Sequence, residues 1–442
     1  MSNNSNNTVA IIGGGIAGLI AAYELIKRGK SVTLFEKNQL GGLIKSSIQD
    51  GFTIEQGATT LALTSSLQKL LNELNLDKEI IYPVTENYGQ YVWWNNTSRL
   101  IPRGPKKMFR SDLLSVTEKL RLIKGLLTKP SQRILDENLS VNDFVTELFG
   151  KATAQKIAAP VTRGIFGGDT NELIAKLVFP KLFAGLTTGL TPLRAMKAQS
   201  TSGRPKIATL QGGNQTLCSK LENIINDQGL IAKSEVSELN YIPSTKSFSI
   251  KSTTQEECNF SSVFVATSAA ATAPFIEKLD PATCNLLKEI KYAELMVLHF
   301  ACKKSAKIPE YGFGLLFPKD NQNDLLGILY NSRIYPHVAP KGSDLITLSF
   351  GGVDGLMFEK ESYTDRGNKV LKSLYDIHDA KLLSKIHWPF AIPQYDSICQ
   401  QSQNSLTQLQ YKFPGLFFIG ADVGGVGVPS RIERSLDMVS SY

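Results

Sequence analysis

The 442-residue chain is poor in the residue types that most often build metal and disulfide sites, with 5 cysteines and 4 histidines. The cysteines are scattered, odd in number and form no C-x-x-C pair, so neither a disulfide framework nor a zinc site is expected. The histidines, His299, His337, His378 and His387, show no metal-ligand spacing. Packing or surface roles are therefore expected for all four.

Long apolar runs are also absent. The longest uncharged apolar stretches, residues 182–193 and 263–275, are shorter than the ~20 residues that a membrane-spanning helix needs. Residues 1–7 lack the basic and apolar regions of a secretion signal. The net charge of +8 permits an anionic membrane, nucleic acid or an acidic substrate and selects none of them. A cytoplasmic protein without a nucleic-acid partner is expected.

A dinucleotide-binding fingerprint is present in residues 8–37, TVAIIGGGIAGLIAAYELIKRGKSVTLFEK. A β-branched apolar run predicts a buried strand over residues 8–12. Gly13, Gly15 and Gly18 then stand in the pattern G-x-G-x-x-G. These glycines allow a tight turn, a close approach of backbone to a pyrophosphate and close packing of helix on strand.

The rest of this unit fits a ligand with phosphates and ribose. Apolar residues at helical spacing predict a helix over residues 16–28, whose N-terminus at Ile16 and Ala17 offers free N–H groups to phosphates. A second predicted strand ends at Glu36, where a carboxylate can accept ribose hydroxyls, and Lys37 follows it. A glycine-rich turn without a nucleotide is the alternative, and the register of strand, glycines, helix and acid argues against it.

Two further glycine motifs indicate which dinucleotide binds. Gly41-Gly42-Leu43 follows the acid, and Asp50-Gly51-Phe52 then precedes Glu55-Gln56-Gly57-Ala58. They resemble the second half of the FAD fingerprint in glutathione-reductase-type flavoproteins, where the double glycine lines the diphosphate and the ribityl chain. Nicotinamide dehydrogenases normally lack this extension, so the resemblance implies FAD.

Later segments complete the expected FAD unit. In FAD proteins of this type the strand equivalent to Val236 meets the adenine, and a strand ending in Ala-Thr, here at Thr267, packs beside the first unit. Near the C-terminus a predicted strand ends in Gly420-Ala421-Asp422, where backbone can approach the ribityl chain. The helix that begins near Val428 can stabilise negative charge on a reduced flavin. The expected cofactor-binding residues are Gly13, Gly15, Ile16, Ala17, Gly18, Glu36, Lys37, Gly41, Gly42, Leu43, Gly57, Ala58, Val236, Thr267, Gly420, Ala421, Asp422 and Val428.

Between the FAD segments the composition changes. Residues 99–133 carry ten Lys and Arg against Asp112 and Glu118, with leucines at helical spacing. Such a basic amphipathic helix fits a membrane interface or a solvated helical face equally well. Residues 163–169 are predicted to form a glycine-rich loop. Farther on, residues 231–239, 297–301, 314–317, 325–330 and 344–350 are predicted strands, and residues 368–379 a helix.

Several motifs together resemble one family, the FAD-dependent protoporphyrinogen oxidases. They are Arg163-Gly-Ile-Phe-Gly-Gly-Asp169 followed by Phe179-Pro-Lys-Leu182, the segment Gly212-Gly-Asn-Gln-Thr-Leu217, and the segments 312–318 and 330–336. The sequence departs from the family pattern at Gly167, where alanine is usual, at Ala58-Thr59-Thr60 and at Leu43. These departures concern the details of the flavin pocket.

The resemblance implies roles for four substrate-binding residues. Arg99 is similar to the arginine that faces a propionate of the tetrapyrrole, and a guanidinium is the natural partner of a carboxylate. Gly164 is similar to a glycine that borders the macrocycle. Leu316 and Tyr335 are similar to the apolar pair that holds the pyrrole rings. On the residues alone, each could equally be an ordinary surface or core residue.

The resemblance also implies an α/β architecture in three parts. A Rossmann-like, glutathione-reductase-type FAD domain would comprise residues 1–80, 205–275 and 405–442. A sheet-plus-helix substrate domain would comprise residues 81–98 and 276–404, and an α-helical membrane-binding insert residues 99–204. The expected location is cytoplasmic and peripheral to the membrane. A homodimer and transfer of the product to a ferrochelatase are further implied partners.

The implied reaction is the six-electron oxidation of protoporphyrinogen IX to protoporphyrin IX in haem synthesis. Dioxygen is the implied acceptor and peroxide the product. The sequence shows no acid–base pair, and none is obligatory because the cofactor supplies the redox chemistry. Coproporphyrinogen III is the rival substrate, since its four carboxylates need a more basic site, and Arg103, Lys106 and Arg163 leave that choice open. An amine oxidase, a carotenoid desaturase and a flavin-binding tetrapyrrole carrier without turnover are the rival functions.

Overall fold

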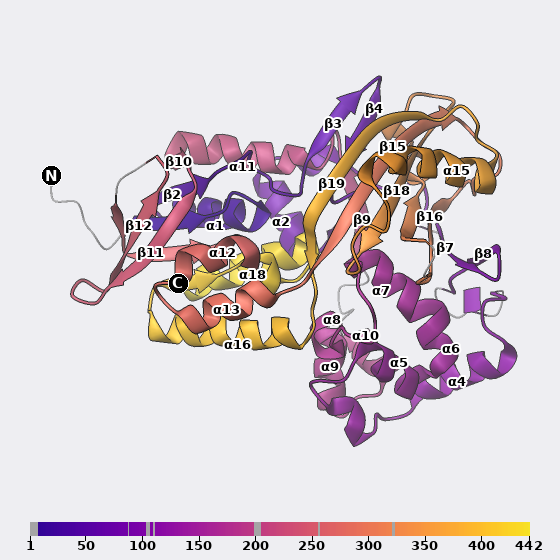
Figure 1. Ribbon diagram of the computed structural model, residues 1–442, viewed down its shortest axis with the longest axis horizontal. Helices are drawn as coiled ribbons and strands as arrows, with labels where there is room; N and C mark the ends of the chain where they lie inside the picture. The colour runs from indigo at the N-terminus through magenta and orange to yellow at the C-terminus, as the bar shows by residue number, and fades with distance from the viewer. Residues whose placement is uncertain are drawn as a thin grey trace.

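A computed structural model describes residues 8–86, 88–102, 107–108, 111–198, 205–254, 257–320 and 323–442. Arg103 and Lys106, two of the cations considered above, lie outside these residues. Three bodies are visible in Figure 1: a layered α/β body with both termini, a large twisted sheet and a cluster of short helices. No helix in the described ranges combines the length and apolar character needed to cross a membrane.

The first body is built on a parallel sheet with the order β10-β2-β1-β14-β20. The strands are β10 (Leu230–Lys233), β2 (Ser31–Glu36), β1 (Thr8–Ile12), β14 (Ser262–Val265) and β20 (Leu416–Phe418). Strand β1 lies in the middle and is buried on both faces, as an all-apolar strand in a parallel sheet should be. The predicted strand over residues 8–12 is confirmed.

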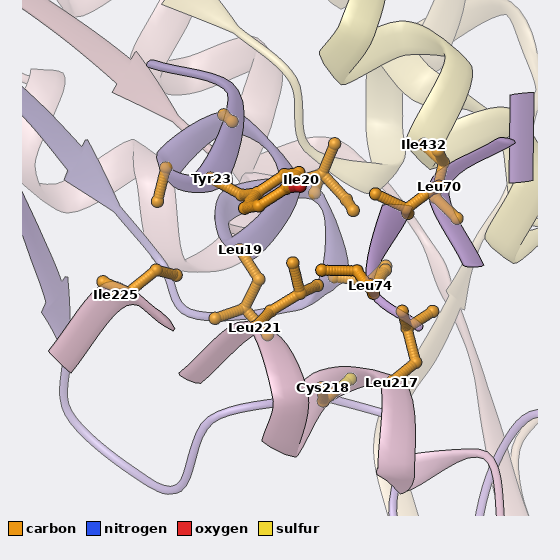
Figure 2. Close-up of a cluster of buried hydrophobic side chains, with 14 of the residues drawn as sticks. Leu19, Ile20, Tyr23, Leu70, Leu74, Leu217, Cys218, Leu221, Ile225 and Ile432 are labelled. Carbon is orange, nitrogen blue, oxygen red and sulfur yellow. The ribbon is translucent and has the colours of Figure 1, made fainter. Parts of the chain in front are cut away.

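Helices cover one face of this sheet and a mixed layer covers the other. Helices α1 (Ile16–Lys27), α2 (Ser65–Glu73), α11 (Gln215–Gln228) and α18 (Val428–Ser441) share one apolar core with the sheet. Figure 2 shows this core, with Leu19 and Tyr23 of α1 between side chains of the other three helices. The other face packs against α12 (Ala269–Ile276), α13 (Pro281–Glu289), α16 (Ser397–Lys412) and the sheet β11 (Val236–Ile242), β12 (Ser247–Ser252) and β13 (Cys258–Phe260).

The strand predicted over residues 231–239 is wrong as a single element. Strand β10 ends at Lys233 and β11 begins at Val236, because the chain turns at Ser234, whose N–H donates to the Ala232 carbonyl two residues earlier at 2.9 Å. The two strands therefore enter different sheets. Smaller elements join this body to the rest: the hairpin β3 (Ser46–Gln49) and β4 (Phe52–Glu55), and the strands β5 (Leu61–Leu63), β9 (Lys206–Leu210) and β6 (Ile80–Ile81).

The second body is a seven-stranded sheet with the order β19-β15-β18-β17-β16-β7-β8. The strands are β19 (Lys381–Pro393), β15 (Tyr292–Lys303), β18 (Ser343–Gly352), β17 (Leu325–Leu329), β16 (Gly312–Leu316), β7 (Gly89–Trp94) and β8 (Thr97–Leu100). One face, with Leu298, Leu315 and Leu348, packs against helix α15 (Tyr363–Tyr375). The helix predicted over 368–379 thus begins earlier and includes Gly367, where a Cβ would lie 2.7 Å from the Phe300 ring.

The third body contains short helices between residues 116 and 198. They are α4 (Val116–Leu127), α5 (Val141–Phe149), α6 (Lys151–Thr153), α7 (Ala159–Phe166), α8 (Ala175–Val178), α9 (Pro180–Thr187) and α10 (Pro192–Ala198), with a π-turn over Ala154–Ala158. Ser115 opens α4 with a capping box that includes Glu118, and Ser140 caps α5. These helices enclose their own apolar core around Phe144 and Phe183.

Candidate active site

The glycine turn after β1 has the geometry that a dinucleotide requires. Gly13 has φ +105°, and a Cβ there would lie 2.9 Å from the Thr267 side chain. A Cβ on Gly18 would lie 1.9 Å from the Gly13 carbonyl oxygen, so α1 can approach the turn only with glycine there. A Cβ on Gly15 would meet nothing within 4 Å. The space beside Gly15 is therefore open at the N-terminus of α1, where N–H groups favour a phosphate.

The double glycine lies directly beside this opening. Gly41 forms a parallel bridge with Gly15, and its N–H donates to the Gly14 carbonyl at 2.9 Å. Gly42 and Leu43 are exposed. Gly57 is also exposed, and a Cβ on it would lie 2.0 Å from the Leu43 carbonyl oxygen. The structure thus brings Gly15, the double glycine and Gly57 together along one open surface, which fits a diphosphate and its attached chain.

Glu36 and Lys37 stand at the end of β2. The Glu36 carboxylate accepts the N–H of Gly14 and the N–H of Asn38, each at 2.7 Å. A carboxylate has further lone pairs, so these bonds hold it beside the glycine turn and leave it able to accept ribose hydroxyls. Lys37 forms an exposed ion pair with Glu235 at 2.7 Å.

The C-terminal motif Gly420-Ala421-Asp422 follows β20, which belongs to the same parallel sheet as β1 and β2. Gly420 packs closely against Thr267, because a Cβ on it would lie 2.2 Å from the Thr267 carbonyl oxygen. Asp422 is the second residue of the short helix α17 (Ala421–Gly424), and its carboxylate accepts the Tyr292 hydroxyl at 2.7 Å. Burial raises the pKa of Asp422. Its side chain therefore belongs to the protein interior, and its backbone is the part that a cofactor could meet.

The remaining expected cofactor residues lie around this surface. Ile16 and Ala17 are buried in the first turn of α1, Val236 is buried at the start of β11, and Val428 is buried at the first position of α18. The Ala58 carbonyl accepts the Asn214 side-chain amide at 2.8 Å. Residues that hold the fold are packed, whereas the space beside Gly15 is open and Gly42 and Gly57 are exposed, and this combination fits FAD.

The second face of the seven-stranded sheet carries the expected substrate residues. Cross-strand partners place Arg99, Val92 and Leu316 side by side on β8, β7 and β16. The row continues through Gly327 on β17 to Ser349 on β18. We call this row the open face, because Leu316, Gly327 and Ser349 stay partly exposed, whereas their strand neighbours are buried against α15. Val92, between Arg99 and Leu316, is the buried member of the row.

Helix α7 covers part of the open face and brings Gly164 to Leu316. A Cβ on Gly164 would lie 2.5 Å from Leu316 Cδ2. The loop predicted over residues 163–169 is wrong in its first half, because α7 continues to Phe166 and only Gly167, with φ +63°, ends it. The glycine at 164 allows the helix to approach the sheet. It is therefore a packing glycine within a helix and not a turn glycine.

Arg99 and Arg163 are both engaged. The Arg99 guanidinium forms an ion pair with Asp112, whose side chain is 70% exposed. Arg163 Nη1 donates to the carbonyl oxygens of Phe317, Pro318 and Leu325 at 3.4, 3.2 and 2.9 Å. An exposed ion pair contributes about 1 kcal/mol or less. Arg99 can therefore exchange its partner for a substrate carboxylate, whereas Arg163 ties α7 to the β16–β17 hairpin.

Tyr335 packs in a different apolar cluster from Leu316. It is 2% exposed and belongs to a cluster with Phe52, Ile54 and Leu345, whereas Leu316 packs in the cluster of Val92 and Ile101. Its neighbours in the motif, Ser332 and Arg333, bind Asp344 in the interior. The structure thus brings together Arg99, Gly164 and Leu316 and does not place Tyr335 in their cluster.

Gly327 and Ser349 were not predicted as site residues. The sequence offers a weak signal for Gly327, since an isolated glycine in a strand marks a close approach. Ser349 gives no local signal, because only the register with β17 places it on the open face.

In the described part of the chain, no group of three His, Cys, Asp or Glu side chains could hold a metal ion.

Comparison with known proteins identifies the class to which this fold and glycine-lined surface belong. Residues 16–433 match the flavin-containing amine oxidoreductases, and the chain belongs to this family. It is an FAD-dependent oxidoreductase.

Curated relatives and solved structures refine the comparison. Over the whole chain it is 28% identical to the mitochondrial protoporphyrinogen oxidase of Nicotiana tabacum, covering 96% of that protein. It is 25% identical to the coproporphyrinogen III oxidase of Bacillus subtilis, with 98% of this chain and 97% of that protein covered. The crystal structure of a protein from Exiguobacterium sp. 255-15 matches with a TM-score of 0.79 at 18% identity, covering 99% of this chain and 98% of the other.

Proposed function

We propose that this enzyme oxidises protoporphyrinogen IX to protoporphyrin IX. The substrate would lose six hydrogens in three two-electron steps, and three molecules of dioxygen would become three of hydrogen peroxide. The observation that carries the proposal is the open face, where an arginine, an apolar row and a close-packed helix glycine adjoin. The names of the relatives support a tetrapyrrole substrate.

The side chains of the open face would bind and orient the substrate. Bound FAD supplies the redox chemistry, as the electron acceptor for the substrate. Arg99 lies two strands from Leu316, or roughly 10 Å away at ordinary strand spacing, so a propionate could reach the guanidinium while the ring lies on apolar surface. The row from Arg99 to Ser349 holds no carboxylate or imidazole, and we assign no catalytic base.

The choice between the two porphyrinogens depends on cations. Coproporphyrinogen III carries four carboxylates, and each needs a partner or water. Arg163 is committed to three backbone carbonyls, and Arg103 and Lys106 lie outside the described residues. Within the described part of the open face, Arg99 is the cation available to a carboxylate. This favours the dicarboxylate protoporphyrinogen.

The test compares kcat/KM for the two porphyrinogens in wild type, Arg99→Ala and Arg133→Ala. Arg133 is the matched control, because its side chain is 72% exposed and it pairs with Glu147 away from the sheet. We expect higher kcat/KM for protoporphyrinogen, a KM raised about tenfold or more by Arg99→Ala, and no change in Arg133→Ala. Preferred turnover of coproporphyrinogen would contradict the substrate, and an unchanged KM would contradict the role of Arg99.

We also propose that helix α4 rests on an anionic membrane surface. Val116, Leu120 and Leu127 are 72, 61 and 60% exposed and recur four and seven residues apart, so they form one apolar stripe. Lys119 and Lys124 flank the stripe, as in helices that lie in a membrane interface.

Co-sedimentation with vesicles containing phosphatidylserine tests this proposal. Wild type should sediment more with anionic than with neutral vesicles, and Leu120→Glu with Leu127→Glu should stay in the supernatant. The matched control is Ile48→Glu, on a distant exposed residue of the β3–β4 hairpin. Wild type that does not sediment with anionic vesicles would contradict the proposed membrane contact of α4.

The homodimer, the transfer to a ferrochelatase, the substrate role of Tyr335 and the three-part domain boundaries stay predictions.

A further inference from the structure

The seven-stranded sheet holds the flavin-lining segment through two side chains that the proposed reaction does not use. His299 on β15 and Trp388 on β19 stand on neighbouring antiparallel strands. His299 Nε2 lies 3.0 Å from the Glu55 carbonyl oxygen, and Trp388 Nε1 donates to the Gln56 carbonyl at 3.0 Å. Figure 1 shows the β3–β4 hairpin near β15 and β19, and the two contacts join the C-terminal end of β4 to these strands.

Both contacts fix the direction of peptide groups next to Gly57. A peptide is planar and trans, so its C=O and N–H point in opposite directions. In the peptide between residues 55 and 56 both ends are held, since His299 binds the carbonyl and the Gln56 N–H donates to the Lys45 carbonyl at 2.8 Å. In the next peptide, Trp388 binds the carbonyl, so the Gly57 N–H points away from β19.

The Gly57 N–H is a hydrogen-bond donor that these contacts leave without an acceptor. Among the described residues it has no acceptor, and Gly57 is exposed on the surface that fits the cofactor. The Glu55 side chain is also fixed, because its carboxylate accepts the Ser46 hydroxyl and the Asn214 N–H, each at 2.7 Å. The segment therefore has little freedom to turn, and the Gly57 N–H has a defined direction.

The chemistry of His299 suits a permanent donor. Its partner is a carbonyl, which can only accept, so Nε2 carries the proton. The ring is fully buried and Nδ1 has no partner among the described residues. Burial lowers the pKa of His299 to about 4, and the ring stays neutral near pH 7.

We propose that Trp388 and His299 are positioning residues for the flavin, which hold the Gln56 and Glu55 carbonyls so that the Gly57 N–H is presented to the bound cofactor. Each contact joins two residues that are far apart in the sequence. The separation is 244 positions for His299 and Glu55 and 332 positions for Trp388 and Gln56. The sheet with the open face thereby sets the orientation of a flavin-binding segment in the other body. The proposal rests on FAD binding and not on the identity of the substrate.

The test measures the FAD dissociation constant, the visible flavin spectrum and the flavin midpoint potential without any porphyrinogen. The variants are Trp388→Phe, His299→Leu and His299→Gln, and the matched controls are Trp93→Phe and His378→Leu. Trp93 packs with the cluster on the opposite face of the sheet, and His378 is exposed. We expect Trp388→Phe and His299→Leu each to weaken FAD binding three- to tenfold and to shift the spectrum and the potential.

His299→Gln should restore most of the affinity and the spectrum, because its amide can still donate. The controls should match wild type. An unchanged spectrum and potential in FAD-saturated Trp388→Phe and His299→Leu would overturn the proposal, whether or not affinity falls, since a purely structural contact would change affinity alone. Because no readout uses a porphyrinogen, failure here is distinct from failure of the proposed reaction.

Discussion

The substitutions Gly15→Ala and Gly18→Ala add the same methyl group to one turn and should affect different properties, FAD binding at Gly15 and the stability of the fold at Gly18. At Gly15 the backbone has φ −70° and ψ 178°, which any residue adopts, and a Cβ meets nothing within 4 Å. Loss of a good N-cap residue and the reduced entropy of the unfolded chain each amount to about 1 kcal/mol and oppose each other. The free energy of unfolding without FAD should therefore change by less than about 1 kcal/mol.

At Gly18 the same methyl would lie 1.9 Å from the Gly13 carbonyl oxygen, a backbone atom that cannot move aside. Helix α1 would have to shift away from β1 and from the core that it shares with α11 and α18. Overpacking of this kind costs about 1–3 kcal/mol, and we expect the upper end or beyond. Gly18→Ala should thus be destabilised before any cofactor is added.

The affinity for FAD is the second property that distinguishes the two substitutions. In Gly15→Ala the methyl occupies the space that a pyrophosphate needs, and losing one charge-assisted hydrogen bond of about 1.5–3 kcal/mol weakens binding roughly 10- to 150-fold. Urea unfolding of the FAD-free protein and titration with FAD measure the two quantities. A Gly15→Ala protein that binds FAD as wild type does would refute this placement of the phosphates, and one as unstable as Gly18→Ala would refute the open geometry.

Three other changes test separate parts of the structure. Arg333→Ala leaves Asp344 unpaired in the interior, where Arg333 Nε and Nη2 bind it at 2.8 and 2.6 Å, and should lower the free energy of unfolding in urea by about 3–5 kcal/mol. Gly164→Ala should displace the flexible end of Leu316 and raise KM several-fold while the free energy of unfolding changes by less than about 1 kcal/mol. Because burial lowers the pKa of His299 to about 4, its stabilising contribution is present above pH 6.5 and is lost as the pH falls towards 4. Between these pH values wild type should lose roughly 3 kcal/mol more stability than His299→Gln, as urea unfolding at each pH would show.

Local sequence patterns predicted the parts of the fold that local chemistry determines. The turn at Gly13, Gly15 and Gly18 is recognisable from its spacing, since Gly13 has φ +105° and a Cβ on Gly18 would meet the Gly13 carbonyl five residues earlier. Gly164 and Gly367 were misinterpreted as loop or boundary signals, since both lie inside helices. Glycine is needed at both positions because of tertiary packing. Gly164 lets its helix approach Leu316, and Gly367 lets its helix approach Phe300. The helix propensity of a residue contains no information about a packing contact with a residue more than 60 positions away in the sequence.

The candidate site was predictable only in part for the same reason. Arg99 and Leu316 were inferred from family motifs, but their alignment through Val92 depends on the register of three strands. Tyr335 shares a motif with buried residues such as Arg333, and the structure places it in the same interior region. His299 and Trp388 gave no functional signal, because their partners are carbonyl groups in a distant part of the chain.

The central claim is that a protein-bound flavin accepts electrons from a porphyrinogen held on the open face. Anaerobic mixing of the FAD-loaded protein with protoporphyrinogen IX tests it most directly. We predict that the yellow flavin absorption bleaches as protoporphyrin fluorescence appears, and that admitting air restores the colour with one peroxide for each two electrons. A flavin that stays oxidised in the presence of both porphyrinogens, or a purified protein that binds no FAD, would contradict the account.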